Sequence, residues 1–259
     1  MVTTAFITGT GFYSLPGMKE IEIKEINTPY GMVNVKIAEF KGSTIAFLPR
    51  HGSDHSITPS KINYRANIFA LKILGVKRIL STSVCGSLEL KWGPGSLILV
   101  DQFLDFTRGR EDTFYPLDGK IAHIDVTEPY CETIHAALIS CSKKLNYSLV
   151  RGGTYACWNG PRFETAAEIE MTRKLGGQLV GQTNYPECVL ARELEICYAT
   201  LGIVSNYAAG MEGSVSSAEV FENLKIIEGM IPNLFASFIE NYPEVVDCSC
   251  QHALEKAFV

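Results

Sequence analysis

The sequence predicts a single α/β domain over 1–259, built on a mixed, largely parallel twisted sheet that is partly barrel-like and flanked by helices. Two observations carry this prediction. Short apolar runs alternate along the chain with segments of helical periodicity, as expected when strands lie between covering helices. The 259 residues, 46% hydrophobic and 20% charged, also suffice for one sizeable core. No linker, internal repeat or low-complexity tract divides the chain.

Six apolar runs are the expected strands, because their length and composition suit buried strands. They are AFIT at 5–8, TIAFLP at 44–49, RILSTSV at 78–84, SLILVDQF at 96–103, QLVGQT at 178–183 and CYATLGIVS at 197–205. The segment GKIAHIDV at 119–126 fits either a strand or an active-site loop, and the sequence leaves both open.

Four segments have the apolar spacing of helices. They are 63–75, 131–145, 163–176 and 217–242, the last interrupted by Pro232. Pro161 suits a turn or a first helical turn, and Gly176-Gly177 closes the third helix.

The composition also indicates which partners to exclude. A formal net charge of −5, without any run of basic residues, argues against a nucleic-acid backbone as partner. The N-terminal MVTTAFITGTG lacks a basic segment followed by a long apolar one, and no apolar stretch approaches the roughly 20 residues that span a bilayer. We therefore expect a cytoplasmic protein with neither a nucleic-acid nor a membrane partner.

Glu164 and Asn206 suggest what the protein binds. Glu164 lies near a predicted helix start, where an acid that merely complements the helix dipole is the common alternative. Asn206 follows a predicted buried strand, at the end where open α/β sheets place their ligands. A carboxylate accepts two N–H hydrogens, and an amide both donates and accepts. Together they match the edge of a 6-oxopurine, with N1–H facing the acid and O6 and N7 facing the amide.

A phosphate site needs backbone N–H groups, hydroxyls and fixed positive charge around one anion. Thr10 lies in a glycine-flanked turn after the first strand and can supply the first two. Arg50 and His51 leave the end of another strand, and an arginine can bind two phosphate oxygens at once. For each of these residues taken alone, a structural role is the alternative.

Several segments in order show a resemblance to a known family. The chain resembles the trimeric nucleoside phosphorylases, specifically the 5′-methylthioadenosine phosphorylase branch. The matching segments are TGTG at 8–11, PRHG at 49–52, PSKINYRAN at 59–67, CGSL at 85–88, DQFLDFT at 101–107, GPRF at 160–163 and YPECVLARE at 185–193. The resemblance implies phosphorolysis of a purine nucleoside by inorganic phosphate as co-substrate, without a metal or cofactor. It adds Ser83, Val84 and Thr183 to the phosphate site.

The base pocket departs from that branch. The branch typically carries a small hydroxyl residue at the position of Glu164 and aspartates at those of Asn206 and Ala208. Glu164 with Asn206 resembles the 6-oxopurine phosphorylases of the same superfamily instead. We therefore expect a 6-oxopurine nucleoside phosphorylase of purine salvage that acts on inosine and guanosine, with S-methyl-5′-thioinosine as a further candidate substrate. S-methyl-5′-thioadenosine phosphorylase is the alternative.

The resemblance also implies roles for individual residues. Catalysis falls to Asn206, Glu164 and His51. Because Asn206 can partly adapt to an adenine by rotating its amide, we expect Glu164 to be the stronger filter between bases. The remaining substrate-binding positions are His55, Phe163, Gln182, Tyr207, Ala208, Ser217, Val220 and His123. His123 is expected from a neighbouring subunit of a homotrimer or dimer of trimers.

Two other classes of protein compete with this interpretation. GTGFYS at 9–14 is a partial dinucleotide-binding turn, but Ser14 replaces the third glycine and no acidic residue is well placed afterwards. An oxidoreductase is thus a remote alternative. A purine-binding protein without catalytic activity is the closer one, because a pocket can outlast catalysis.

The eight cysteines carry separate information. Cys85, Cys157 and Cys188 are expected to be small buried hydrophobes. The sequence shows no tight His/Cys cluster for zinc. The ending CSCQHALEKAFV resembles archaeal members from hot environments, and this resemblance implies disulfides between Cys131 and Cys197 and between Cys248 and Cys250.

Overall fold

A mixed sheet of 11 strands runs through the computed structural model, which describes residues 2–116, 119–243 and 247–259. Its strands are β1 (Thr4–Thr8), β2 (Lys19–Thr28), β3 (Gly31–Phe40), β4 (Ser43–Pro49), β5 (Arg78–Ser87), β6 (Leu97–Leu99), β7 (Gln102–Asp105), β8 (Leu149–Arg151), β9 (Thr154–Cys157), β10 (Leu179–Gly181) and β11 (Cys197–Tyr207). They follow the order β2-β3-β4-β1-β5-β10-β9-β7, and a branch of β11, β6 and β8 leaves at β5. The strands β4, β1, β5 and β11 are parallel.

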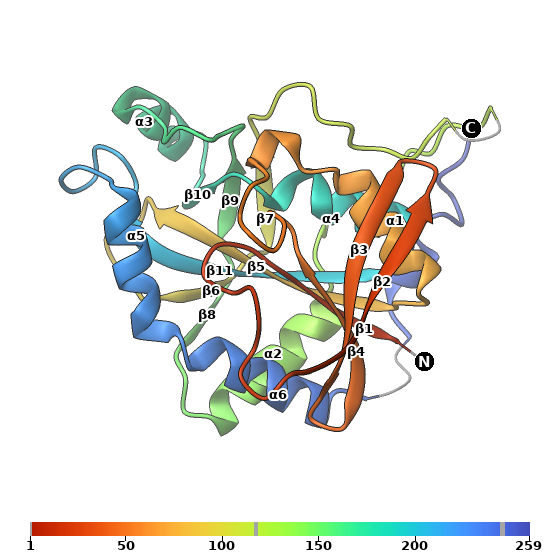
Figure 1. The fold of residues 1–259 in the computed structure, drawn as a ribbon. Coiled ribbons are helices and arrows are strands. Elements are labelled where there is room, and N and C mark those ends of the chain that lie inside the picture. Colours follow the sequence, from red (N-terminus) through yellow and green to blue (C-terminus); the bar gives the residue numbers. More distant parts are fainter. Residues whose placement is uncertain (1, 117–118, 244–246) are drawn as a thin grey trace.

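Helices cover both faces of this sheet (Figure 1). They are α1 (Tyr64–Ile73), α2 (Glu132–Lys144), α3 (Ala166–Lys174), α4 (Asn184–Glu193), α5 (Ser217–Leu224) and α6 (Met230–Asn241), with 3-10 turns η1 (Pro59–Lys61), η2 (Lys225–Ile227) and η3 (Ser249–His252). The helices α1 and α4 contact each other, as do α2 and α6. The mixed sheet flanked by helices confirms the predicted fold class.

Alternation along β1 divides the core into two parts. Ala5 and Ile7 pack in the cluster that contains α1 and α4, whereas Phe6 packs in the cluster of α2 and α6. The Phe6 ring stacks on Phe235 of α6 with centroids 4.3 Å apart. Successive strand residues face opposite sides of the sheet, so a continuous apolar run is what a strand with two covered faces requires.

The strand predictions are confirmed with two differences. The run 96–103 forms two strands, because the chain leaves β11 after Leu99 and pairs with β9 from Gln102. The strands β2, β3, β8 and β9 were not predicted. In β2 nearly every residue is exposed, including Ile21 and Ile23, so the strand has no buried face from which to identify it.

The helix predictions also hold, with shifted ends. The break within 217–242 falls at η2 and Gly229, and Pro232 lies in the first turn of α6, where proline is tolerated. Helix α4 was matched only as a family segment and not predicted as a helix. The segment 119–126 contains no named strand; its Ala122 bridges to Phe258, so it is a loop paired with the C-terminal tail.

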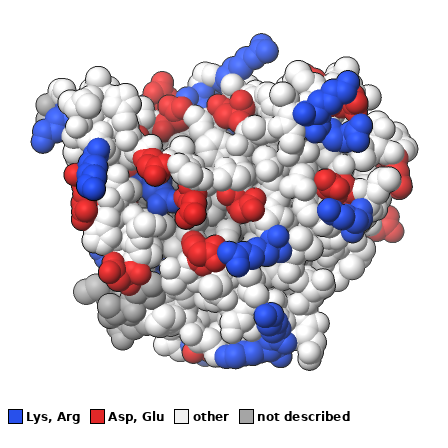
Figure 2. Space-filling view, turned by 180° about the vertical axis from the view of Figure 1, so that it is seen from behind, with Lys and Arg blue, Asp and Glu red and all other residues white. Residues whose placement is uncertain are grey.

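None of the helices in the described residues combines the length and apolar character needed to cross a membrane. On the face drawn in Figure 2, acidic side chains gather near the middle, and lysines and arginines are spaced around them. That face therefore presents charges of both signs.

Candidate active site

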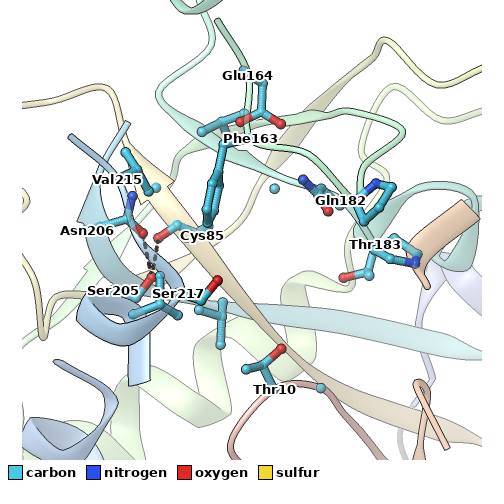
Figure 3. A pocket seen from close by; sticks show the side chains of 18 of the residues that line it. Thr10, Cys85, Phe163, Glu164, Gln182, Thr183, Ser205, Asn206, Val215 and Ser217 are labelled. Carbon is cyan, nitrogen blue, oxygen red and sulfur yellow. Dashed lines mark hydrogen bonds between the residues drawn. The ribbon is translucent and has the colours of Figure 1, made fainter. Parts of the chain in front are cut away.

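A cavity of about 250 Å³ lies where several parallel strands end. Its walls come from the turns after β1 and β4, from β5, β10 and β11, from the loop before α3, and from α5. The predicted residues that line it are Thr10, Arg50, His51, His55, Val84, Phe163, Glu164, Gln182, Thr183, Asn206, Ala208, Ser217 and Val220. Figure 3 shows the hydroxyls of Thr10 and Thr183 on one side of this cavity and Asn206 and Glu164 on the other.

Arg50 is held by other protein groups. Its Nε and Nη2 donate to the Glu187 carboxylate at 3.0 and 2.9 Å, Nη2 also donates to Ser81 Oγ at 2.6 Å, and Nη1 donates to the Thr82 carbonyl at 2.7 Å. Four of the five guanidinium N–H groups are thereby used, which leaves one on Nη1. A methyl group on Gly9 would lie 2.9 Å from Nη1, so this nitrogen faces the β1 turn. The expected two-oxygen grip of Arg50 on phosphate is therefore wrong.

His51 is neutral in this site. Burial lowers the pKa of His51 to about 4, and the charge of Arg50 acts in the same direction. Nδ1 lies 2.8 Å from the Ile57 carbonyl, to which a neutral ring donates its proton. Nε2 is then an acceptor, and it faces the same turn as Arg50, about 3.8 Å from a methyl placed on Gly9. The positive charge expected at the phosphate site is therefore limited to Arg50, which Glu187 compensates.

Threonine hydroxyls supply the remaining polar groups on this side. Thr10 precedes Gly11, whose φ of 85° bends the turn after β1. Thr183 occupies the N-cap position of α4, but its side chain makes no capping hydrogen bond. Its Oγ1 lies 3.3 Å from Ser83 Oγ, which also bonds the Tyr155 hydroxyl at 2.8 Å. Both threonines therefore retain hydrogen-bonding capacity toward the cavity.

Glu164 lies outside α3 and is 9% exposed. Thr165 caps the helix, and the capping box is completed by Glu168, which is the first-turn acid. The alternative that Glu164 merely complements the helix dipole is thus overturned. Burial raises the pKa of Glu164, while hydrogen bonds that its carboxylate accepts from its own backbone N–H and from Gln182 oppose this rise. Glu164 lines the cavity, so its carboxyl group can face a ligand there.

Asn206 is fixed by its strand neighbours. Ser205 Oγ donates to Asn206 Oδ1 at 2.7 Å, and Asn206 Nδ2 donates to the Tyr207 carbonyl at 2.7 Å (Figure 3 draws the first bond). The pairing of β11 with β5 shifts register between Val204 and Asn206, which is a bulge that re-aims side chains. A rotated amide would set its oxygen against the Tyr207 carbonyl, where two acceptors meet, so this contact opposes the expected adaptation by rotation. One N–H of Nδ2 remains for a ligand.

The residues between these two sides are mostly apolar. The Phe163 ring projects into the cavity between Asn206 and Gln182, and it is 42% exposed (Figure 3). Gln182 Nε2 donates to the Arg162 carbonyl at 3.0 Å, which orients its amide beside Glu164. Ala208 is 1% exposed and its methyl group adds no polar atom to this wall.

A third group lies toward α5. Ser217 begins that helix, and Val220 and Phe221 also line the cavity. The ring of His55 stacks on that of His51 at 4.8 Å between centroids, and its Nδ1 hydrogen bonds with Tyr13. This wall therefore combines apolar groups with one imidazole.

Three predicted residues lie outside the cavity lining. Ser83 is buried behind Val84, because strand neighbours face opposite sides. The Tyr207 hydroxyl donates to the Leu90 carbonyl at 3.0 Å, away from the cavity. His123 lies in a second cavity beside the C-terminal tail, with its N–H bonded to the Ala257 carbonyl at 2.7 Å. Within its own chain, His123 does not reach the site.

Other residues were missed. Ser205, Cys85, Val180 and Phe221 line the cavity, while Tyr13 and Glu187 bond to groups that do. Alternation along β11 could not have identified Ser205, because a bulge interrupts it. Glu187 is 137 positions from Arg50, so no local pattern links the two.

The cysteines give a further correction. Cys131, Cys197, Cys248 and Cys250 have their sulfur atoms within 4.8 Å of one another, although the sequence showed no tight cluster. No described cysteine pair lies at bonding distance, and all eight are free thiols. The sulfur atoms of Cys197 and Cys248, which are not a predicted pair, lie 3.1 Å apart.

Comparisons with known proteins agree with this geometry. The model of the Phosphorylase superfamily matches residues 3–240. The chain is 47% identical over 264 residues to a probable 6-oxopurine nucleoside phosphorylase of Thermococcus kodakarensis, covering 99% of each chain. It is 44% identical over 261 residues to a probable S-methyl-5′-thioinosine phosphorylase of Methanopyrus kandleri, covering 100% of each. A crystal structure of methylthioadenosine phosphorylase from an antarctic soil metagenomic library superposes with a TM-score of 0.90 at 33% identity, covering 100% of this chain and 92% of the other. The match along most of the chain, with the fold and cavity above, confirms the resemblance: the chain is an enzyme of the phosphorylase superfamily.

Proposed function

We propose that the enzyme catalyses the reversible phosphorolysis of 6-oxopurine nucleosides, chiefly inosine and guanosine, in purine salvage. The observation that carries this proposal is the placement of Glu164 and Asn206 on one side of a cavity with the hydroxyls of Thr10 and Thr183 on the other (Figure 3). A nucleoside needs such a division, because its base and the attacking phosphate lie on different sides of the sugar.

The base pocket matches a 6-oxopurine in hydrogen bonding. An ionised Glu164 accepts N1–H and any 2-amino group. The remaining N–H of Asn206 Nδ2 donates to O6 or N7, and Ser205 holds the amide in that orientation. Adenine presents a bare N1 lone pair to Glu164, so two acceptors meet. A closed pocket with such a mismatch can favour the matching base over the mismatched one by a factor of roughly 10⁴–10⁵ in kcat/KM.

Phosphate is the co-substrate on the opposite side. Thr10 and Thr183 supply hydroxyls, Arg50 supplies one N–H, and backbone N–H groups of the β1 turn complete the donor set. Neutral His51 offers Nε2 as an acceptor, which suits a protonated phosphate oxygen. The weakly charged site thus binds phosphate mainly through directed hydrogen bonds.

The reaction breaks the C1′–N9 bond while a phosphate oxygen forms a bond to C1′. Positive charge grows on the sugar and negative charge on the departing base, and the site stabilises both at once. The phosphate is nucleophile and counter-charge, and Asn206 donates to the base as it receives the bonding electrons. Glu164 holds N1–H throughout. The step forms no covalent enzyme intermediate and uses neither metal nor cofactor.

A second candidate substrate is S-methyl-5′-thioinosine. The apolar Val220 and Phe221 on α5 favour a methylthio group, whereas Ser217 and His55 suit a 5′-hydroxyl. The base is the same, so this candidate keeps the roles of Glu164 and Asn206. S-methyl-5′-thioadenosine meets the mismatch at Glu164 and is disfavoured.

We further propose a cytoplasmic homotrimer or dimer of trimers. His123, which lies outside the cavity of its own chain, then reaches the 5′ side of a neighbouring site. This assignment is supported by the resemblance to trimeric phosphorylases.

The test compares kcat/KM for inosine, guanosine, S-methyl-5′-thioinosine, adenosine and S-methyl-5′-thioadenosine, with phosphate present and absent. The three 6-oxopurine nucleosides are expected to react only with phosphate, and both adenine nucleosides poorly. Preference for an adenine nucleoside would overturn the base assignment. Failure of all five, with base binding intact, would point to the non-catalytic alternative. Hydride transfer to a nicotinamide would point to the remote oxidoreductase.

A further inference from the structure

Four cysteines gather far from the active site. The sulfur atoms of Cys131, Cys197, Cys248 and Cys250 all lie within 4.8 Å of one another. The distance from Cys248 Sγ is 3.1 Å to Cys197 and 3.9 Å to Cys131. A tetrahedral site with Zn–S bonds of about 2.3 Å has sulfur atoms about 3.8 Å apart. The sulfur atoms therefore lie close enough together for small side-chain shifts to place four thiolates around one ion.

Three separate parts of the fold hold these thiols. Cys131 caps α2, and its backbone N–H bonds the Tyr198 carbonyl at 2.8 Å. Cys197 begins β11. Cys248 and Cys250 come from the C-terminal tail, the first capping η3 and the second lying within it. The cluster is thus positioned by helix, sheet and tail together, as a structural metal site is.

Three of the four cysteines are buried, and Cys248 is half-buried. Cys131, Cys197 and Cys250 are 2–3% exposed, and all three belong to the core cluster that contains α2 and α6. Structural zinc sites in proteins have four protein ligands and no open position. The cluster offers four sulfur ligands, so no ligand from solvent is required.

The surroundings also favour thiolates. Cys131 is the N-cap residue of α2, directly before Glu132, the first residue of the helix. A helix N-terminus stabilises a thiolate. Four thiolates around a divalent ion leave a net charge of −2, which the N-terminal end of α2 helps to stabilise.

We infer that the reduced chain binds one thiophilic divalent ion, Zn²⁺ by preference, through the sulfur atoms of Cys131, Cys197, Cys248 and Cys250. The role is structural. The ion joins the C-terminal tail to the start of α2 and the start of β11. A further contact of the tail, from Leu254 N–H to the Glu195 carboxylate at 3.2 Å, lies just before β11.

The alternative is a pair of disulfides. The resemblance implied Cys131 with Cys197 and Cys248 with Cys250, yet all four thiols are free, and Cys248 Sγ lies 3.1 Å from Cys197 Sγ, across the two implied pairs. Two disulfides need each sulfur to approach one partner to about 2 Å, whereas a metal needs all four at similar spacing. The mutual approach of four sulfur atoms favours the metal.

The experiment measures metal on the full chain, produced in zinc-supplemented cells and purified anaerobically with a phosphine reductant. Mass spectrometry of the metal content is expected to find one zinc per chain. Replacement of zinc by Co²⁺ is expected to give the intense visible absorption of tetrahedral cobalt–thiolate sites. Hydrogen exchange over 247–259 is expected to rise when the ion is removed.

Matched variants locate the site. Cys131→Ser and Cys250→Ser are expected to lose zinc, while Cys141→Ser, a buried position in α2 outside the cluster, keeps it. If the first two variants fail to fold, the cobalt spectrum of the parent chain still decides. Four alkylatable thiols without stoichiometric zinc would overturn the inference. Disulfides trapped by acid quenching of the producing cells would overturn it as well.

Discussion

The Arg50 guanidinium and the Glu187 carboxylate form a two-point ion pair, at 3.0 Å for Nε–Oε2 and 2.9 Å for Nη2–Oε1, with each side chain only 1% exposed. Burial alone would lower the pKa of Arg50, but the charge and hydrogen bonds of Glu187 raise it. Glu187 does not line the cavity, whereas Arg50 does. Glu187 therefore orients the one N–H of Arg50 that remains free of protein partners, which the proposed function assigns to phosphate.

Glu187→Gln is expected to destabilise the protein and weaken phosphate binding. Breaking a buried ion pair from one side costs about 3–5 kcal/mol, because a charge is left without its partner. Denaturant unfolding measures the first effect, and KM for phosphate at saturating inosine measures the second. Glu170→Gln, which removes two exposed ion pairs on α3, is the control. Its free energy of unfolding is expected to stay within about 0.5 kcal/mol of the parent value. Equal stabilities for the two variants would contradict the assigned role.

Glu164 is expected to set the acid limit of activity on inosine. Burial raises the pKa of Glu164, so its carboxylate gains a proton at a higher pH than an ordinary glutamate. Protonation removes the acceptor for N1–H, and kcat/KM for inosine therefore falls as pH decreases through that raised value. Glu164→Gln is expected to lose about 10- to 100-fold in kcat/KM, since a hydrogen bond to a charged group contributes roughly 1.5–3 kcal/mol.

The pH profile of that variant is the deciding measurement. Glu164→Gln has no carboxylate to titrate, so its profile is expected to lack the acid limb that the parent shows. Glu168→Gln, which removes the capping-box acid, should retain the limb. An identical limb in all three proteins would refute the assignment.

His51 is expected to make the protein less stable at mildly acidic pH. Its folded pKa of about 4 lies below the ordinary value of 6.5. Between these values the unfolded chain binds a proton that the folded chain does not, so stability falls as pH decreases from 6.5 to 4 and then levels off. The contribution is on the order of 3 kcal/mol. His51→Gln should flatten that part of the stability profile measured by denaturant unfolding; a profile parallel to the parent's would contradict it.

The sequence could predict what depends on local pattern. The alternation of apolar runs and helices predicted the fold class, and Glu164 and Asn206 were identified from their places beside a helix start and a strand end. Both line the cavity. These positions follow from chain geometry within a few residues, which sequence periodicity records.

What the sequence could not predict depends on contacts between distant residues. Glu187, which accepts two hydrogen bonds from the Arg50 guanidinium, lies 137 positions away in the sequence. The bulge that fixes Asn206 arises from pairing with β5, and the four cysteines meet only because α2, β11 and the tail converge. The side-chain direction of Tyr207 likewise follows from the local register of β11.

Mixing two inactive variants is expected to restore activity if subunits share sites. His123→Ala removes the residue proposed to come from the neighbour, and Asn206→Ala removes a residue within the chain's own cavity. In randomly reassembled trimers, roughly a quarter of the sites contain both native residues. Activity is measured on inosine after co-refolding or co-expression. If light scattering shows the parent protein to be a monomer that is fully active at the assay concentration, the shared site is refuted.

Changing the base pocket is expected to reverse its selectivity. Glu164→Ser removes the acceptor that faces the bare N1 of adenine, and Asn206→Asp with Ala208→Asp supplies carboxylates for its 6-amino group and N7. Ser205 still donates to position 206, because that bond ends on an oxygen in either residue. The ratio of kcat/KM for adenosine over inosine should therefore rise in the triple variant.

Ala208 is 1% exposed, so its replacement by aspartate costs stability unless a purine pairs with it. Glu164→Ser alone is the informative comparison: it should raise the ratio by removing the mismatch while adding no attraction. If neither variant changes the ratio, recognition of the base lies elsewhere in the cavity.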